Sequence, residues 1–238
     1  MAEGVGTDGT PPGRKLENIV TTQLKEFASS AARPLPVILL ADVSGSMAVE
    51  GKIDALNQSV REMLATFAST DDLRAEIHVA IITFGGEARL HTPLQPASTV
   101  KWSDMVADGG TPMGQAMTLA ADLIDDKDKI PGRAYRPTVV LISDGQPTDS
   151  WQSGLDRMTK NGRAQKADRM ALAIGGDADT DMLRRFLNDE KKQVFVAADA
   201  RRIKDFFQFV TMSVTARSRS ANPNEVPQMQ NPFDLDRV

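Results

Sequence analysis

An apolar run at residues 36–41 is followed directly by Asp42, Ser44 and Ser46. The run carries no charge and is rich in aliphatic side chains, which predicts a strand buried on both faces of a sheet. Strands of this kind belong to parallel sheets with helices on each side. Asp42 therefore ends a buried strand, at the edge where open α/β sheets bind ligands.

Further apolar runs alternate with amphipathic segments between residues 37 and 214. The alternation predicts an α/β fold, a Rossmann-like, doubly wound, mostly parallel sheet with helices on both faces. Gly85 and Gly86 predict a tight turn into an edge strand that pairs as a hairpin. Strands are predicted at 37–41, 75–84, 88–94, 138–143, 169–174 and 193–196. Helices are predicted at 52–68, 112–124, 150–161, 180–188 and 203–214.

Composition changes sharply outside this region and predicts four parts. Residues 1–13 are rich in Gly, Pro and Thr and predict a disordered leader. Residues 14–33 show apolar positions at helical spacing and predict an N-terminal amphipathic helix. Residues 34–216 form the predicted domain. Residues 217–238 carry three prolines among polar residues, and we expect a flexible tail that begins with a solvated charge run.

The amino-acid composition and net charge argue against several classes of function. With 41% hydrophobic and 25% charged residues, the 238-residue chain is an ordinary globular protein. Its net charge of −4 and scattered Lys and Arg argue against a nucleic-acid partner. The absence of cysteine excludes thiolate metal sites. Residues 1–13 lack the features of a signal peptide, and no apolar stretch approaches the ~20 residues that span a bilayer, so a cytoplasmic protein without a membrane partner is expected.

Two of the predicted strands end in aspartate, at Asp42 and Asp144. In a doubly wound sheet of order 3-2-1-4-5-6, the first and fourth strands are neighbours, so both carboxylates would face one crevice. Thr111 lies on a loop that enters between them, held by Gly109 and Gly110. Carboxylates and hydroxyls are hard oxygen ligands, suited to Mg²⁺ or Mn²⁺.

Three segments carry a resemblance to a known family: residues 42–46, the loop at residues 109–112, and Asp144 with the strand before it. Together they resemble the metal-ion-dependent adhesion site (MIDAS) of von Willebrand factor A (vWA) domains, and the resemblance extends across roughly residues 35–215. The resemblance implies the vWA fold, with one antiparallel edge strand, and a Mg²⁺ (or Mn²⁺) ion with an open coordination position. It implies that an Asp or Glu of a partner protein fills this position, in a non-enzymatic interaction module. The implied ligands are Asp42, Ser44, Ser46, Thr111 and Asp144.

Two segments, residues 34–37 and 136–151, more narrowly resemble the bacterial TerY-like branch of the family, which is associated with tellurium resistance and stress islands. That resemblance implies a stress-response or phosphosignalling system. It implies a serine/threonine phosphatase, a serine/threonine kinase, or both, as protein partners.

The alternative to an interaction module is an enzyme that uses the same acidic site, either a metal-dependent phosphatase or a nucleotide hydrolase. A phosphoryl-transfer enzyme of the dehalogenase type needs a second carboxylate two residues after its first Asp, and here that position is Ser44. The two histidines, His78 and His91, support no Ser-His-Asp triad.

Several residues near the motifs have more than one reading. Asp149 and Gln152 resemble a capping box for the helix predicted at 150–161. Trp151 either lines the ligand face or packs in the core. On a flexible tether, Asp234 or Asp236 could reach the open metal position and inhibit binding.

Overall fold

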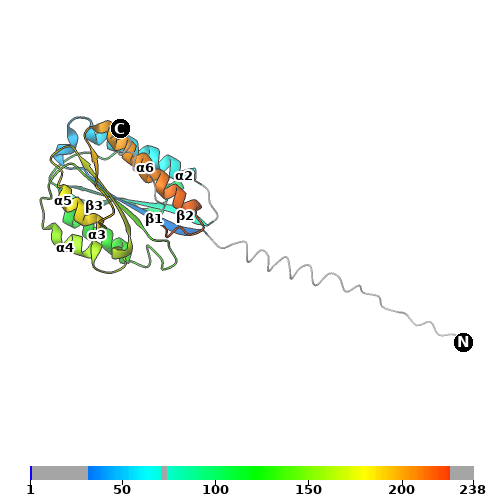
Figure 1. Ribbon diagram of the computed structural model, residues 1–238. Helices are drawn as coiled ribbons and strands as arrows, with labels where there is room; N and C mark the ends of the chain where they lie inside the picture. Colours follow the sequence, from blue (N-terminus) through cyan, green and yellow to red (C-terminus); the bar gives the residue numbers. More distant parts are fainter. Residues whose placement is uncertain (2–31, 71–73, 226–238) are drawn as a thin grey trace. The chain divides into compact units, whose positions relative to one another are not determined.

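The computed structural model describes residues 1, 32–70 and 74–225 (Figure 1). The chain divides into two units, 1–32 and 33–238, and every described helix and strand belongs to the second. The predicted leader and nearly all of the predicted N-terminal helix therefore lie outside the described residues. Asp234 and Asp236 lie outside them as well.

Six strands of the described chain form one sheet, in the order β3-β2-β1-β4-β5-β6. β3 is antiparallel to β2, and all other neighbours are parallel. The predicted α/β, doubly wound, mostly parallel sheet with an edge hairpin is confirmed. The strands are β1 Arg33–Asp42, β2 Ala75–Gly85, β3 Glu87–Pro96, β4 Thr138–Ser143, β5 Asp168–Ile174 and β6 Phe195–Ala197.

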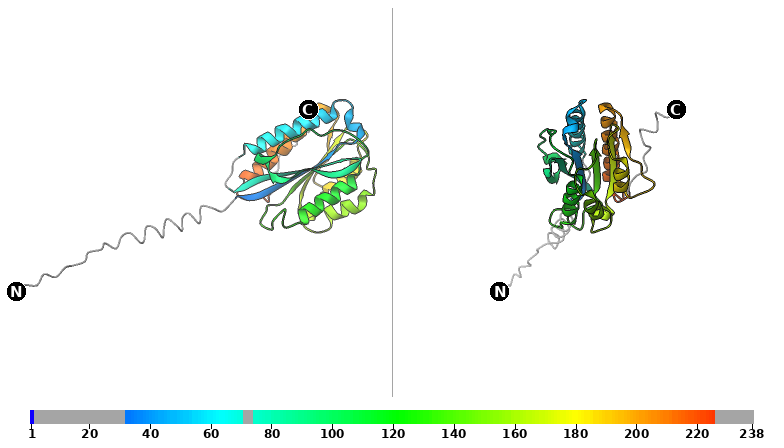
Figure 2. Two further views of the ribbon diagram at one scale, coloured as in Figure 1. Left: turned by 180° about the vertical axis from the view of Figure 1, so that it is seen from behind. Right: turned by 90° about the vertical axis from the view of Figure 1, so that its left-hand side faces the viewer.

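Helices cover both faces of the sheet (Figures 1 and 2). On one face lie α2 Lys52–Ala68 and α6 Ala200–Arg219, side by side. On the other lie α3 Met113–Asp125, α4 Trp151–Thr159 and α5 Thr180–Leu187. Three short 3-10 turns connect elements, at Gly45–Ala48, Ala97–Thr99 and Ala164–Lys166.

Each face of the sheet has its own hydrophobic core, and β1 contributes to both. Leu39 packs into the core under α2 and α6, whereas Leu40 packs into the core under α3, α4 and α5. Both side chains are fully buried, and such burial stabilises the fold by ~2 kcal/mol for each leucine. Because both faces of β1 are buried, a charged side chain on this strand could not reach solvent. This explains why the run contains only apolar residues.

β1 begins at Arg33, four residues before the predicted start at residue 37. This stretch contains Pro34 and Pro36, and proline cannot donate a hydrogen bond to a neighbouring strand. In this stretch β1 pairs only with β2, since pairing with β4 starts at Val37. On the β4 side the carbonyl of Pro34 accepts a hydrogen bond from Tyr135 N at 2.8 Å. Proline is tolerated because no partner strand on that side needs its N–H.

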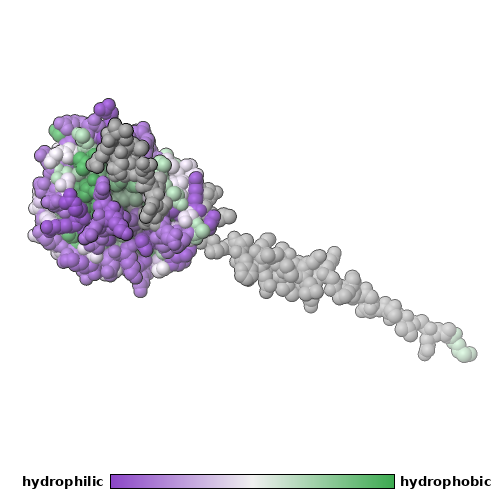
Figure 3. Space-filling model, in the orientation of Figure 1, coloured by the Kyte–Doolittle hydropathy of each residue, from purple (hydrophilic) through white to green (hydrophobic). Residues whose placement is uncertain are grey.

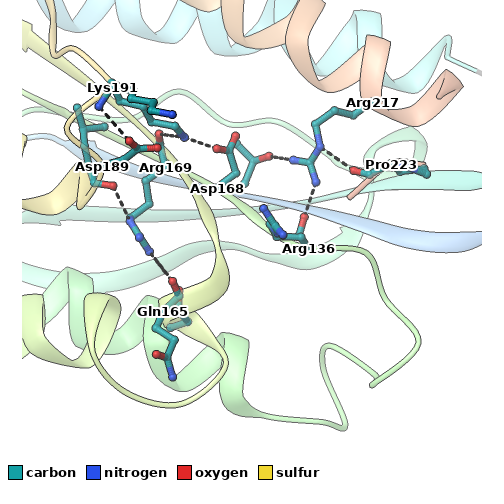
Figure 4. A network of polar contacts seen from close by, with 12 residues as sticks. Arg136, Gln165, Asp168, Arg169, Asp189, Lys191, Arg217 and Pro223 are labelled. Atoms are coloured by element: carbon teal, nitrogen blue, oxygen red, sulfur yellow. Dashed lines mark hydrogen bonds and ion pairs between the residues drawn. The ribbon is translucent and has the colours of Figure 1, made fainter. Parts of the chain in front are cut away.

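The domain also extends beyond its predicted end at residue 216, because α6 continues to Arg219. Arg217 and Ser218, predicted to lie in a solvated charge run, are fully buried. The Arg217 guanidinium donates to the Pro223 carbonyl at 2.9 Å, to the Arg136 carbonyl at 2.7 Å and to the Thr138 hydroxyl (Figure 4). It thereby joins the end of α6 to the amino end of β4.

A second buried arginine, Arg169 on β5, belongs to the network of polar contacts that Figure 4 shows, and its guanidinium points away from Arg217. It donates to the carbonyls of Met158 and Leu187, at the ends of α4 and α5. The last carbonyls of a helix lack partners within the helix, so a cation there satisfies them. The pKa of Arg169 is lowered mainly by this burial.

Hydrophilic residues cover most of the described surface that faces the viewer in Figure 3. A smaller hydrophobic area is visible beside them. Within the described ranges, none of the helices combines the length and the apolar character needed to cross a membrane.

The Arg217→Ala variant tests the role of the buried guanidinium. Its removal leaves two carbonyls and a hydroxyl without their donor in a buried place, so we expect the free energy of unfolding to fall by about 3 kcal/mol. Urea denaturation measures this change. Arg219→Ala is the matched control, because Arg219 is exposed on the same helix and should change stability by less than about 0.5 kcal/mol. Equal effects of both variants would contradict a structural role for Arg217.

Candidate metal centre

The pairing of β1 with β4 brings Asp42 and Asp144 to one edge of the sheet. Ala41 is the register partner of Ile142, so Asp42 lies beside Ser143 at the carboxyl ends of both strands. Ser143 Oγ donates to Asp42 Oδ2 at 2.5 Å. Asp42 and Asp144 are both buried. Two carboxylates predicted to share a crevice thus lie at neighbouring strand ends.

The two serines of the motif connect these carboxylates. Ser44 N donates to Asp42 Oδ1 at 2.8 Å, which fixes the turn after β1. Ser44 Oγ lies 3.0 Å from Ser46 Oγ. Ser46 Oγ in turn donates to Asp144 Oδ1 at 2.7 Å. Four of the five predicted ligands are therefore connected, Asp42 to Ser44 through the Ser44 backbone N–H and the others through their hydroxyl and carboxylate oxygens.

The loop before Thr111 is fixed between the ends of β1 and β2. Asp108 N donates to Val43 O at 2.7 Å, and Gly109 O accepts from Gly45 N at 2.9 Å. Gly109 has φ +74°, and a Cβ on it would lie 2.5 Å from the Cα of Gly86. Only glycine allows the loop to come this close with that backbone conformation.

Thr111 lies at the end of this loop and faces Ser46 across Gly145. A Cβ built on Gly145 would lie 3.8 Å from Thr111 Oγ1 and 4.0 Å from Ser46 Oγ. Thr111 is held by Thr148, whose hydroxyl accepts from Thr111 N at 2.9 Å and whose N donates to Thr111 O at 3.0 Å. All five predicted residues therefore meet in one place.

Burial raises the pKa of Asp42 to about 6. Desolvation is the main cause, and hydrogen bonds from Ser143 and Ser44 oppose it. The nearby charge of Asp144 raises the pKa further. The carboxylate form of Asp42 thus lacks solvation that a nearby cation would supply.

The donor set fits a hard divalent cation. It consists of two carboxylates and three hydroxyls, all of them oxygen ligands. Within the described residues, no cluster of three or more His, Cys, Asp or Glu could hold a metal ion. A metal here would depend on hydroxyl ligands, as the resemblance implies. With about six positions around Mg²⁺, five side chains leave at least one for an oxygen from outside.

Lys52 also belongs to this centre, and the sequence reasoning missed it. Its Nζ lies 2.9 Å from Asp144 Oδ2. Lys52 is the first residue of α2, where the helix dipole disfavours a cation. A lysine at a position that suits aspartate or glutamate is the sequence signal that could have identified it.

Asp149 caps a helix other than the predicted one. Its carboxylate accepts from Gly114 N at 3.0 Å and from Gln115 N at 2.9 Å, at the start of α3. The helix that follows it, α4, has Ser150 as its N-cap residue and receives no side-chain cap. The predicted capping box was therefore wrong about its target. Asp149 stabilises the helix that follows Thr111.

Trp151 is half-buried and packs against the core under α3, α4 and α5. The Arg185 guanidinium lies over its ring, 5.8 Å from the centroid. Trp151 lines a groove between α4 and α5 that includes none of the five site residues. Of its two readings, the structure supports packing.

A family model for the von Willebrand factor type A domain matches residues 37–209. The inter-alpha-trypsin inhibitor heavy chain H2 of Homo sapiens is 29% identical over 181 residues, which are 68% of this chain and 18% of that protein. An uncharacterized protein of Mycobacterium tuberculosis is 30% identical over 184 residues, 75% of this chain and 26% of that protein. The chain thus spans about a fifth to a quarter of the length of these relatives.

Solved structures share the fold. A von Willebrand factor type A protein from Catenulispora acidiphila superposes with a TM-score of 0.59 and 20% identity, over 77% of this chain and 43% of that one. Proximal thread matrix protein 1 from the mussel byssus, with a zinc-occupied MIDAS motif, gives a TM-score of 0.58 and 13% identity, over 78% of this chain and 48% of that one. At these identities the likeness concerns the fold.

The Asp149→Ala variant tests the cap of α3. Two backbone N–H groups lose their acceptor, so we expect the free energy of unfolding to fall by about 1 kcal/mol. Chemical denaturation measures it. Ser150→Ala is the matched control, since the Ser150 side chain makes no cap hydrogen bond, and it should leave stability nearly unchanged. A larger loss with Ser150→Ala than with Asp149→Ala would contradict the assignment of Asp149 as the cap of α3.

Proposed function

The chain belongs to the von Willebrand factor type A family, and on this premise we propose that it is a non-enzymatic interaction module that binds partner proteins through a divalent cation. The cation is Mg²⁺ or Mn²⁺, and a partner Asp or Glu completes its coordination. The proposed metal ligands are Asp42, Ser44, Ser46, Thr111 and Asp144.

The observation that carries this proposal is the meeting of three separate segments at one sheet edge. Ser44, Ser46 and Asp144 are linked through hydroxyl contacts of 3.0 Å or less, and the Ser44 N–H donates to Asp42 at 2.8 Å. Thr111 faces the same place. The three hydroxyl ligands bring no formal charge, so only the two carboxylates of this chain offset the charge of a bound divalent cation. Such an ion attracts a carboxylate from outside. The mussel protein with a zinc-occupied MIDAS motif gives a precedent for a metal in this fold.

The proposal gives the centre no catalytic role. General acid–base catalysis at such a centre needs a side chain within hydrogen-bond reach of the transferred proton. His78 contacts Glu76, and His91 contacts the Ser103 carbonyl. In the described chain neither histidine has a hydrogen bond to a proposed ligand. A metal-dependent phosphatase or nucleotide hydrolase stays an alternative that the tests below address.

We also propose a biological setting, a bacterial TerY-type stress-response or phosphosignalling system. Its support is the resemblance of residues 34–37 and 136–151 to that branch. The partner in this setting is a serine/threonine phosphatase, a serine/threonine kinase, or both, in the cytoplasm. A chain without cysteine fits a reducing compartment.

Mn²⁺ binding by wild-type protein and by Thr111→Val tests the metal centre. The variant keeps the shape of the side chain and removes one ligand, so we expect the Kd for Mn²⁺ to rise at least about tenfold. Isothermal titration calorimetry measures it. Thr118→Val is the matched control, because its hydroxyl bonds to Gly114 O within α3 and contacts no proposed ligand. An unchanged Kd in Thr111→Val would overturn the ligand assignment.

Partner binding gives the second test of the proposal. Capture of a serine/threonine phosphatase or kinase of the proposed system should be lost with EDTA, restored by Mg²⁺, and absent with Asp42→Ala. Capture that ignores both EDTA and the variant would overturn the metal-bridged mechanism. Metal-dependent turnover of a phosphate ester or a nucleotide that Asp144→Ala abolishes would establish the enzymatic alternative instead.

A further inference from the structure

Lys52 places a fixed positive charge inside the proposed metal centre. Its ammonium contacts Asp144 Oδ2, while Ser46 occupies Oδ1 of the same carboxylate. The Asp144 side chain is fully buried, and the Lys52 side chain is 14% exposed. Solvent therefore screens this ion pair much less than one on the surface.

The position of Lys52 is not one that its own helix favours. The positive end of the dipole of α2 repels a cation at the first helical residue. The turn that delivers Lys52 there has two successive residues with positive φ, Glu50 at 57° and Gly51 at 69°. For a non-glycine residue such as Glu50 this conformation is unfavourable. The ion pair with Asp144 is a favourable contact that acts against these costs.

The charge balance of the centre shows what Lys52 changes. With both carboxylates ionised, Asp42 and Asp144 carry two negative charges, of which Lys52 compensates one. A divalent cation that binds here therefore meets the Lys52 ammonium, which already contacts the proposed ligand Asp144. The loaded centre then has one net positive charge, which a single carboxylate neutralises. Without Lys52, the loaded centre is neutral before any partner arrives.

We propose that Lys52 is a specificity-determining residue of the metal centre, which lowers its affinity for the cation and raises its affinity for an anionic ligand. This inference rests on the proposed function and adds to it. In the metal-free protein Lys52 compensates the buried Asp144. In the loaded protein the same ammonium adds to the attraction for the incoming carboxylate. The two effects have opposite signs, which separates this role from a purely structural one.

The first measurement uses Mn²⁺ alone, titrated into wild-type protein, Lys52→Met and Lys52→Gln. Loss of the competing ammonium should lower the Kd for Mn²⁺ by about tenfold, which corresponds to ~1.4 kcal/mol of binding free energy. Lys52→Gln keeps a polar contact with Asp144 and secures the test if the Met variant folds poorly. Lys204→Met is the matched control, since Lys204 pairs with Glu62 in an exposed ion pair and should leave the Kd unchanged.

The second measurement uses acetate as a minimal carboxylate ligand. At constant ionic strength, acetate at about 100 mM should tighten Mn²⁺ binding by the wild type about twofold more than binding by Lys52→Met. Chelation of free Mn²⁺ by acetate is common to both proteins and cancels in the comparison. Lys52→Arg keeps the charge and should behave like the wild type.

The outcomes separate this inference from the proposed function. If neither the wild type nor a Lys52 variant binds Mn²⁺, the metal centre itself is wrong, and the role of Lys52 falls with it. If the wild type binds and the Lys52 variants bind with the same or weaker affinity, only the role of Lys52 is overturned. Tighter Mn²⁺ binding with a lost acetate effect supports the inference in both parts.

Discussion

Two carboxylates held side by side out of water are the constraint on which the rest of this centre depends. Parallel pairing of β1 with β4 leaves no choice about their position, because the two strands end at the same edge. Like charges in a buried place repel each other and lose solvation, as the raised pKa of Asp42 reflects. The surrounding groups offset this cost: the backbone of Ser44, the hydroxyls of Ser46 and Ser143, and the ammonium of Lys52.

The loop that carries Thr111 shows how the fold turns this arrangement into a defined coordination shell. Hydrogen bonds from Asp108 and to Gly109 fix the loop against the turn after β1. Asp149 then caps α3 immediately behind it, from a different part of the chain. Thr111 is thus positioned from both sides by groups that are not themselves proposed ligands. Support of this kind is needed for hydroxyl ligands, which bind a cation less strongly than carboxylates do.

Sequence reasoning predicted the features that depend on local patterns. The charge-free run before Asp42 predicted a strand buried on both faces, and alternation predicted the sheet that is observed. The features it missed depend on contacts between distant residues. Asp149 precedes α4 in the sequence but caps α3. Arg217 was predicted to lie in a polar tail but is fully buried. Lys52 pairs with Asp144, which is 92 positions away in the sequence. The periodicity of apolar residues along the sequence gives no information about such contacts between distant residues.

The network around Arg217 also sets a limit on how this domain can be joined to other sequence. Its guanidinium is held by the Pro223 carbonyl, and Asn224 accepts a hydrogen bond from Arg136 N, so both join the polypeptide after α6 to the strand edge opposite the metal centre. A neighbouring domain in a longer polypeptide could begin only after these residues without replacing their contacts. The segment after α6 is therefore part of the folded unit as far as Asn224.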